Sequence, residues 1–206
     1  PENGMRKTSY HHGNLPEALV VAAVEIIGAR GVDGLTMRAV GEALGVSHAA
    51  PYRHYKDKEA LLAAVATDGF RLMRDAMRAS RDAAGPDLMD RLAACGRAYI
   101  RFAVRHPCHY RVMFGPASRN KMEHPEMLGA SLETFGLILE CLEAAKAAGI
   151  VRDEPAIELG IVAWSQAHGL SLLLIDDQFE LGDIDDDALD GYAHRATSVM
   201  GAGLLR

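Results

Sequence analysis

Polar and capping residues are concentrated between Thr36 and Lys58, in a segment that the residue pattern divides into two short helices. Thr36 and Ser47 each precede a helical run and can cap it through the side-chain hydroxyl. Gly45 stands between the two runs, and glycine readily adopts the positive φ that a sharp reversal requires. The inward anchors of the segment are Met37, Val40, Leu44 and Val46. Two capped helices joined by a tight turn predict a helix-turn-helix.

The outward side chains of this segment are of the kind that contact DNA. Ser47 combines a hydroxyl with the free backbone N–H groups of a helix start, which suits a phosphate. His48 and Ala49 lie at the leading tip, where base edges are met, and the donors one turn further back are placed for flanking phosphates. The predicted DNA-contacting set is Thr36, Arg38, Ser47, His48, Ala49, Tyr52, His54, Tyr55 and Lys58. The alternative for Tyr52 and Tyr55 is that their rings pack beneath the second helix, with the hydroxyls at its edge.

The rest of the chain has the helical period almost throughout, without alternating β-branched runs or Asn-Gly turns. Glycine, proline and capping residues delimit helices predicted over 14–30, 37–44, 48–55, 58–80, 87–105, 108–114, 125–148, 154–177 and 185–204. We therefore predict an all-α fold of about nine helices. A helix-turn-helix DNA-binding domain over 1–60 is expected to precede a helical effector-binding and dimerisation domain over 61–206.

Three runs in the N-terminal part resemble the TetR family of bacterial repressors. They are YHHGNL at 10–15, VGEALGVS at 40–47 and YRHYKDKEALL at 52–62, together with the turn at 31–36. The resemblance implies a DNA-binding domain of three helices and the start of a fourth. It also implies that His48 and Ala49 lie near the bases. The phosphate contacts that it implies are Ser47, Tyr52, Tyr55 and Lys58.

Two features leave the details of DNA contact open. Pro51 stands where such proteins often carry Leu or Ile. Its missing N–H is tolerable in the first turn of a helix, but it is expected to shift the recognition helix. Arg6 and Lys7 either reach the minor groove as an arm or belong to a merely floppy tail.

Trp164, His168 and Gly169 resemble the signature of the TetR subgroup named for Trp-His-Gly, and the run HPCHYRVMF at 106–114 is also similar to that subgroup. Trp164 and His168 fall on one apolar helical stripe, shared with Ile157, Ile161, Leu172 and Ile175. His168 is either a core histidine satisfied by a neighbouring carbonyl or the polar anchor of a small-molecule cavity. The predicted effector-binding set is Tyr99, Phe102, Tyr110, Met113, Phe114, Phe135, Trp164 and His168.

Rows of small residues mark the last two predicted helices. They comprise Gly160, Ala163, Ala167 and Ser171 on the helix over 154–177, and Ala193, Thr197 and Gly201 on the helix over 185–204. Small faces let two helices approach closely. We predict that both helices pair with their copies across a two-fold axis as a four-helix bundle, which the family resemblance also implies. The alternative is a helix crossing within one subunit.

Charge is unevenly distributed along the 206-residue chain, whose formal net charge is −6. Residues 1–58 hold seven Lys and Arg against six Asp and Glu, whereas residues 176–190 hold eight Asp and Glu and neither Lys nor Arg. The acidic run is predicted to be a solvated loop. The whole-chain charge does not argue against nucleic acid, because phosphate attraction depends on the local field of the docking face.

Several functional classes lack their motifs here. There is no GxSxG, P-loop, HExxH or Rossmann glycine pattern, so we expect neither an enzyme nor a cofactor. Cys108 lies between His106 and His109 in a run without regular ligand geometry, so no metal site is expected. No apolar run approaches the length of a membrane span and the first ten residues have no signal core, which favours a cytoplasmic protein without a membrane partner.

The sequence thus predicts a transcriptional repressor that binds palindromic double-stranded operator DNA as a homodimer and is released by a small-molecule effector. The alternative is a non-catalytic helical protein-interaction module that has lost operator binding. Loss of DNA binding would be expected to erode Tyr52, Tyr55 and Lys58 together, and all three are present.

Overall fold

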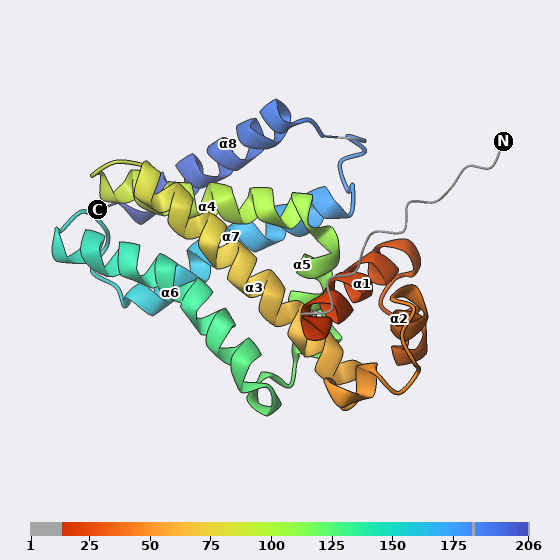
Figure 1. The fold of residues 1–206 in the computed structure, drawn as a ribbon. Helices are drawn as coiled ribbons and strands as arrows, with labels where there is room; N and C mark the ends of the chain where they lie inside the picture. The colour runs from red at the N-terminus through yellow and green to blue at the C-terminus, as the bar shows by residue number, and fades with distance from the viewer. Residues whose placement is uncertain (1–13, 183, 206) are drawn as a thin grey trace. The chain divides into compact units, whose positions relative to one another are not determined.

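A computed structural model describes residues 14–182 and 184–205, and the chain divides into two compact units, Pro1–Leu62 and Ala63–Arg206 (Figure 1). The described residues form eight α-helices and three short 3₁₀ helices. They contain no strand, only an isolated antiparallel bridge between Val151 and Leu205. The all-α prediction is confirmed.

The first unit holds α1 (Leu15–Arg30), α2 (Met37–Ala43), a 3₁₀ turn η1 (Pro51–Arg53) and the start of α3 (Lys58–Ala83). α1 ends at Gly31, which has a φ of 70°. The Thr36 hydroxyl caps α2 by accepting a hydrogen bond from the backbone N–H of Ala39 at 3.1 Å. The core of the unit is built from side chains no more than 5% exposed: Leu19, Ala23, Ile27, Met37 and Val40. α1 therefore packs against α2 through these buried side chains.

The turn after α2 is a Schellman motif centred on Gly45. The Gly45 N–H donates to Glu42 O at 3.1 Å and the Val46 N–H donates to Gly41 O at 3.0 Å. Gly45 has a φ of 65°, the left-handed conformation that this motif requires and that a side chain disfavours. The reversal predicted from Gly45 is therefore present, and glycine is needed there.

Gly45→Ala should lower the free energy of unfolding by about 1 kcal/mol, because alanine is strained at positive φ. Gly129 provides a matched control: it lies inside α6, and nothing is within 4 Å of an added Cβ. Gly129→Ala should raise stability by about 0.4–1 kcal/mol. Chemical unfolding followed by circular dichroism measures both variants, and effects of the same sign would contradict this account.

The predicted α-helix over 48–55 is wrong. Residues 48–50 form a turn that is followed by η1, and the Ala50 N–H donates to Ser47 O at 2.9 Å. In an α-helix capped by Ser47, residue 51 would donate the first intrahelical hydrogen bond, which proline cannot do. Pro51 is buried, and its ring lies against Gly41 of α2. Pro51 therefore lies one position beyond those at which the first turn of a helix accepts proline. The segment forms a turn and a 3₁₀ helix instead.

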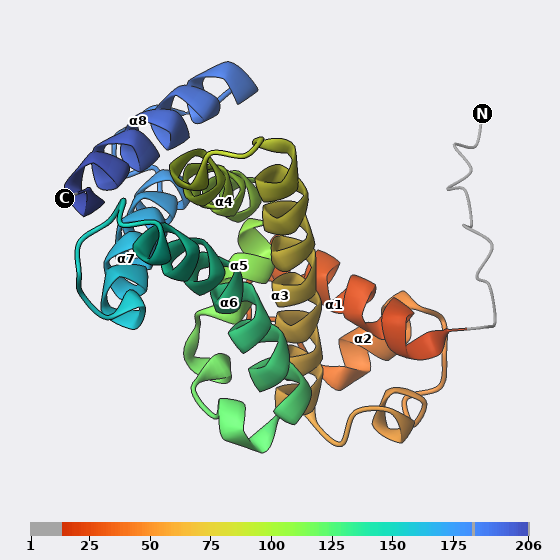
Figure 2. The ribbon, with the colours of Figure 1, turned by 90° about the vertical axis from the view of Figure 1, so that its left-hand side faces the viewer.

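The second unit contains the remainder of α3 and seven further helices. These are α4 (Leu88–Arg105), α5 (Pro107–Met113), η2 (Pro116–Ser118), η3 (Lys121–Glu123), α6 (Pro125–Ala147), α7 (Ala156–Ile175) and α8 (Asp186–Leu204). α4 packs against α6, α7 and α8 (Figures 1 and 2). Asp87 and Asp185 cap α4 and α8 by accepting from backbone N–H groups at 2.8–2.9 Å. These local signals explain why the predicted helix starts agree with the structure.

The small face of α7 is oriented opposite to the prediction, and the predicted apolar stripe is only partly buried. The small residues Gly160, Ala163, Ala167 and Ser171 are buried within the unit. A Cβ on Gly160 would lie 2.9 Å from the Leu139 side chain of α6, so the small face permits close packing inside one subunit. In the predicted apolar stripe, Ile157 is 48% and Ile161 49% exposed, whereas Trp164 and His168 are partly buried and bond to Tyr99 of α4.

The small row on α8 also faces inward. Ala193 and Thr197 are 1% and 3% exposed, and a Cβ on Gly96 of α4 would lie 2.7 Å from the Thr197 methyl group. Both small rows therefore serve helix crossings within the subunit, the arrangement left as the alternative above.

Among the described helices, α7 alone has the length and mean hydropathy (1.2) of a membrane span. Its small face packs against α4, α6 and α8, as expected for a core helix of a globular unit. Its length and composition are therefore weak evidence for a membrane segment.

Candidate functional site

The tip of the helix-turn-helix is exposed in the first unit. Ser47, His48, Ala49 and His54 are exposed, and Tyr52 is 56% exposed. The backbone N–H groups of Ala50, Arg53, His54 and Tyr55 donate within the segment, so the groups offered to a ligand are chiefly the exposed side chains. The predicted phosphate-facing and base-facing residues therefore share one short stretch of exposed backbone.

Two other predicted DNA contacts have partners inside the unit. The Tyr55 hydroxyl donates to Pro16 O at 3.2 Å, and the Lys58 ammonium donates to Val32 O at 2.7 Å. Tyr55 is half-buried, which agrees with the alternative of a packed ring whose hydroxyl lies at the edge. Tyr52 is exposed, so that alternative does not apply to it. Through these hydrogen bonds, Tyr55 and Lys58 anchor the exposed segment to the rest of the unit.

The two predicted contacts on α2 are placed differently. Thr36 is occupied as the N-cap of α2. Arg38 is exposed and pairs with Glu42 one turn along at 2.7 Å, so its guanidinium can exchange this surface partner for a phosphate. Arg6 and Lys7, the predicted arm, lie outside the described residues.

A cavity of about 360 Å³ lies within the second unit. Its walls come from α3, α4, α5, η3, α6 and α7. The predicted effector residues that line it are Tyr99, Phe114, Phe135 and Trp164. The predicted effector set did not include the other lining residues, which are Phe70, Met73, Met77, Lys121, Ser131, Leu132, Thr134, Ile138, Ile157 and Ile161. The i, i+3, i+7 spacing of Phe70, Met73 and Met77 was a signal that could have found the α3 wall.

Polar groups behind the cavity wall form one connected cluster. The Trp164 indole N–H donates to the Tyr99 hydroxyl at 3.1 Å. The Tyr99 and Tyr110 hydroxyls lie 2.9 Å apart, and they lie 2.9 Å and 2.6 Å from His168 Nδ1. Burial raises the pKa of both tyrosines, that of Tyr110 to about 12, and lowers the pKa of His168. Burial therefore favours the neutral imidazole, and its Nδ1 joins the two tyrosine hydroxyls in one hydrogen-bonded cluster that positions Trp164 through Tyr99.

Four predicted effector residues do not line the cavity. His168 and Tyr110 stand behind Tyr99 in the polar cluster. Phe102 stacks on His106 with ring centroids 4.6 Å apart. Met113 fills the space over Gly69 of α3, where a Cβ would lie 2.6 Å from the Met113 sulfur. The first two position a wall residue, and the other two belong to the core.

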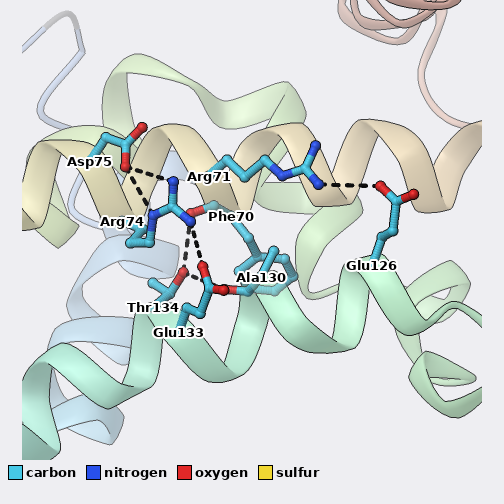
Figure 3. Close-up of polar contacts among 8 residues, drawn as sticks. All are labelled: Phe70, Arg71, Arg74, Asp75, Glu126, Ala130, Glu133 and Thr134. Atoms are coloured by element: carbon cyan, nitrogen blue, oxygen red, sulfur yellow. Dashed lines mark hydrogen bonds and ion pairs between the residues drawn. The ribbon is translucent and has the colours of Figure 1, made fainter.

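Ion pairs fasten α3 to α6 alongside the cavity (Figure 3). Arg71 pairs with Glu126, Arg74 with Glu133, and Arg81 with Glu140. The Thr134 hydroxyl lies 3.1 Å from Phe70 O and 2.8 Å from Ala130 O, so it bridges the two helices beneath these pairs. These ion pairs and the Thr134 hydrogen bonds thus hold α3 and α6 together beside the cavity.

Acidification should destabilise the second unit, because burial holds the folded pKa of His168 below its ordinary value of 6.5. The neutral ring contributes stability that is present above pH 6.5 and is lost as the pH falls through the lower folded pKa. His168→Gln should flatten this dependence, leaving the contribution of His106, whose pKa is lowered by burial too. Urea unfolding followed by Trp164 fluorescence tests this prediction. An unchanged pH dependence in the variant would exclude His168 as its source.

Comparison with known families covers both units. The family "Bacterial regulatory proteins, tetR family" matches residues 19–65, and "Tetracyclin repressor-like, C-terminal domain" matches residues 92–199. The second match alone covers more than half of the chain. Neither match indicates a catalytic function.

The "HTH-type transcriptional regulator Mb1846" of Mycobacterium bovis is 26% identical over 124 residues, which are 59% of this chain and 53% of that protein. The chain thus spans about half the length of such curated relatives. A solved structure of a protein of unknown function from Rhodococcus sp. RHA1 has a TM-score of 0.80 at 28% identity, over 97% of this chain and 100% of the other.

A bacterial regulatory protein of the tetR family from Rhodococcus RHA1 has a TM-score of 0.73 at 20% identity, over 92% of this chain and 96% of the other. At that identity the likeness concerns the fold, an N-terminal helix-turn-helix followed by a helical C-terminal domain. Fold, motif and family matches agree. The chain belongs to the TetR family of transcriptional regulators, with a DNA-binding helix-turn-helix in its first unit.

Proposed function

We propose that this protein is a repressor that binds a palindromic operator as a homodimer and leaves it when a small molecule enters the cavity of the second unit. The observation that carries the DNA-binding part is the exposed tip from Ser47 to His54. Phosphate contacts would come from Ser47, Tyr52 and Arg38, and base contacts from His48 and Ala49.

The dimer would form through α7 and α8, within the helices predicted over 154–177 and 185–204, but through their exposed residues and not through the small rows. Ile161, Val162, Leu172 and Leu173 of α7 and Val199 of α8 are 36–70% exposed. Apolar side chains at such exposure are expected to mark an interaction surface. Two copies would bring two tips to successive major grooves of the operator.

The effector would act on α3. This helix begins with Lys58 in the first unit, and its Phe70, Met73 and Met77 line the cavity. The α3–α6 wall would have one arrangement in dimers that can bind DNA and another in dimers that cannot. A ligand that prefers the second would lower the population of the first, to an extent set by its difference in affinity for the two. Effector identity would be set by Trp164, Phe135, Phe114 and Tyr99, with His168 positioning Tyr99.

Two finer assignments follow from the residues. Trp164, His168 and Gly169 on α7, with the cluster that joins Trp164 to His168 through Tyr99, support membership of the Trp-His-Gly subgroup. A regulator of cellular DNA would work in the cytoplasm.

Selection of bound sequences from a random DNA pool tests the proposal. A recovered palindrome with half-sites about one helical turn apart, bound with an affinity that falls steeply as salt rises, is the expected result. Recovery of no enriched sequence, together with no salt-dependent binding of random DNA, would favour the protein-interaction module instead.

A further inference from the structure

Lys121 is placed at the wall of the apolar cavity. It belongs to the short turn η3, it is half-buried, and its ammonium lies 4.8 Å from the centroid of the Phe70 ring. Among the described residues the ammonium has no ion pair and no hydrogen bond, although Glu123 and Glu126 follow it closely in the chain. A contact with an aromatic face compensates only part of the hydration that a buried ammonium loses.

The other polar groups of the cavity wall already donate hydrogen bonds within the protein. The Ser131 hydroxyl donates to Leu128 O at 2.9 Å, and the Thr134 hydroxyl is shared between two backbone carbonyls. The Trp164 N–H donates to Tyr99. Lys121 is the one charged side chain among the described residues that line the cavity, and it alone has N–H groups free for a ligand.

Burial also lowers the pKa of Lys121, because the surrounding side chains do not replace the hydration of its charged form. A negatively charged ligand group would supply it through a short charge-assisted hydrogen bond. A cationic ligand would be repelled, and a neutral ligand would leave the ammonium as it is.

We propose that the effector of this cavity is an amphipathic organic anion, whose carboxylate pairs with Lys121 and whose apolar body packs against Phe70, Phe135 and Trp164. The inference rests on the proposed function of the cavity as the effector site. The volume of about 360 Å³ is at the lower end of the range of about 300–1,000 Å³ for small-molecule sites, so a compact body is expected.

Three probes with one body and different head groups separate the possibilities: 4-phenylbutanoate, 4-phenylbutan-1-ol and 4-phenylbutylamine. Trp164 is the sole tryptophan of the chain and lies in the cavity wall, so its fluorescence reports occupancy, and calorimetry gives the dissociation constants. The unmodified 206-residue chain is compared with Lys121→Met, Lys121→Arg and Arg119→Met. Arg119 is an exposed cation two residues away and does not line the cavity, so its variant controls for general charge.

The expected result is that the carboxylate binds at least about tenfold more tightly than the alcohol, and the amine most weakly. Lys121→Met should remove this preference while the alcohol still binds, Lys121→Arg should retain most of it, and Arg119→Met should leave it unchanged. Equal binding of carboxylate and alcohol, or a preference that survives Lys121→Met, would overturn the inference while leaving the cavity as a ligand site. Failure of all three probes to alter Trp164 fluorescence or release heat would contradict both the inference and the proposed effector site. Operator binding, measured separately, decides the DNA-binding part.

Discussion

Glutamate in place of Val162 should convert the protein from a dimer to a monomer. Val162 is 57% exposed on α7, between the exposed side chains of Ile161 and Ser165, so the substitution leaves the fold of one subunit intact. In a symmetric interface each copy would bury an unpaired carboxylate, and the two charges would face each other near the two-fold axis. Operator affinity should fall by about 100-fold or more, because each tip then binds without its partner.

Val21→Glu is the matched control. Val21 of α1 is 58% exposed, so the chemical change and its exposure are the same, but it lies in the first unit. Sedimentation or light scattering at micromolar concentration should show a dimer for this variant and a monomer for Val162→Glu. A dimer in both would place the interface elsewhere, and a monomeric unmodified protein would reject the dimer altogether.

Tyr52→Glu should abolish specific DNA binding while leaving the dimer intact. The Tyr52 side chain is 56% exposed at the tip, so its replacement does not disturb the core. A carboxylate in place of the phenol loses a phosphate donor and repels the phosphate, and the dimer suffers the effect twice. Like charges brought together cost several kcal/mol, so a loss of about 100-fold or more in affinity is expected.

Tyr52→Phe separates repulsion from the loss of a donor. It removes one hydroxyl per subunit without adding a charge. A hydrogen bond to a charged group contributes about 1.5–3 kcal/mol, so a loss of at least about tenfold per subunit is expected, and Tyr52→Glu should lose more because it also repels the phosphate. Fluorescence anisotropy with the selected operator measures both variants, and the dimer mass confirms their integrity. If Tyr52→Glu bound the operator as tightly as the unmodified protein, the tip would not be the DNA-facing surface.

The sequence was most informative where a local interaction decides the structure. Asp87, Asp185 and Thr36 each cap the helix that begins after them, and the turn at Gly45 depends on backbone freedom that glycine alone supplies. Pro51 belongs to the same class, since its missing N–H acts within one turn. The error over 48–55 was one of position: in a helix capped by Ser47, residue 51 is the first to donate inside the helix.

The orientation of α7 could not be predicted from periodicity. Small residues line one side of this helix and large apolar residues line another, so both sides look suited to a core. The side that faces inward is decided by the space that α4, α6 and α8 leave, as the Leu139 contact at Gly160 shows. Because that space depends on the other helices, it cannot be inferred from the sequence of α7.

The cavity was predictable only in part, for a related reason. Helical spacing identified Trp164. Tyr99, Phe114 and Phe135 were named with it as large side chains, but so were Phe102, Tyr110 and Met113, which do not line the cavity. Lys121 lies in a loop between predicted helices, and its approach to Phe70 depends on the path of that loop. A solvated lysine and a lysine in a cavity wall have the same sequence signature.

Under the proposed function, the ligand-binding and dimer-forming roles of α7 would overlap at Ile157 and Ile161. Both isoleucines line the cavity, and both are about half exposed on the side that also carries Val162. A mutation there alters ligand fit and the outer apolar surface together, so selection on one constrains the other. Residues such as Met73 and Met77 of α3 are buried and line the cavity without joining that surface. New effector preferences should therefore evolve mainly through α3 and α6, and relatives that respond to different molecules should differ there more than along α7.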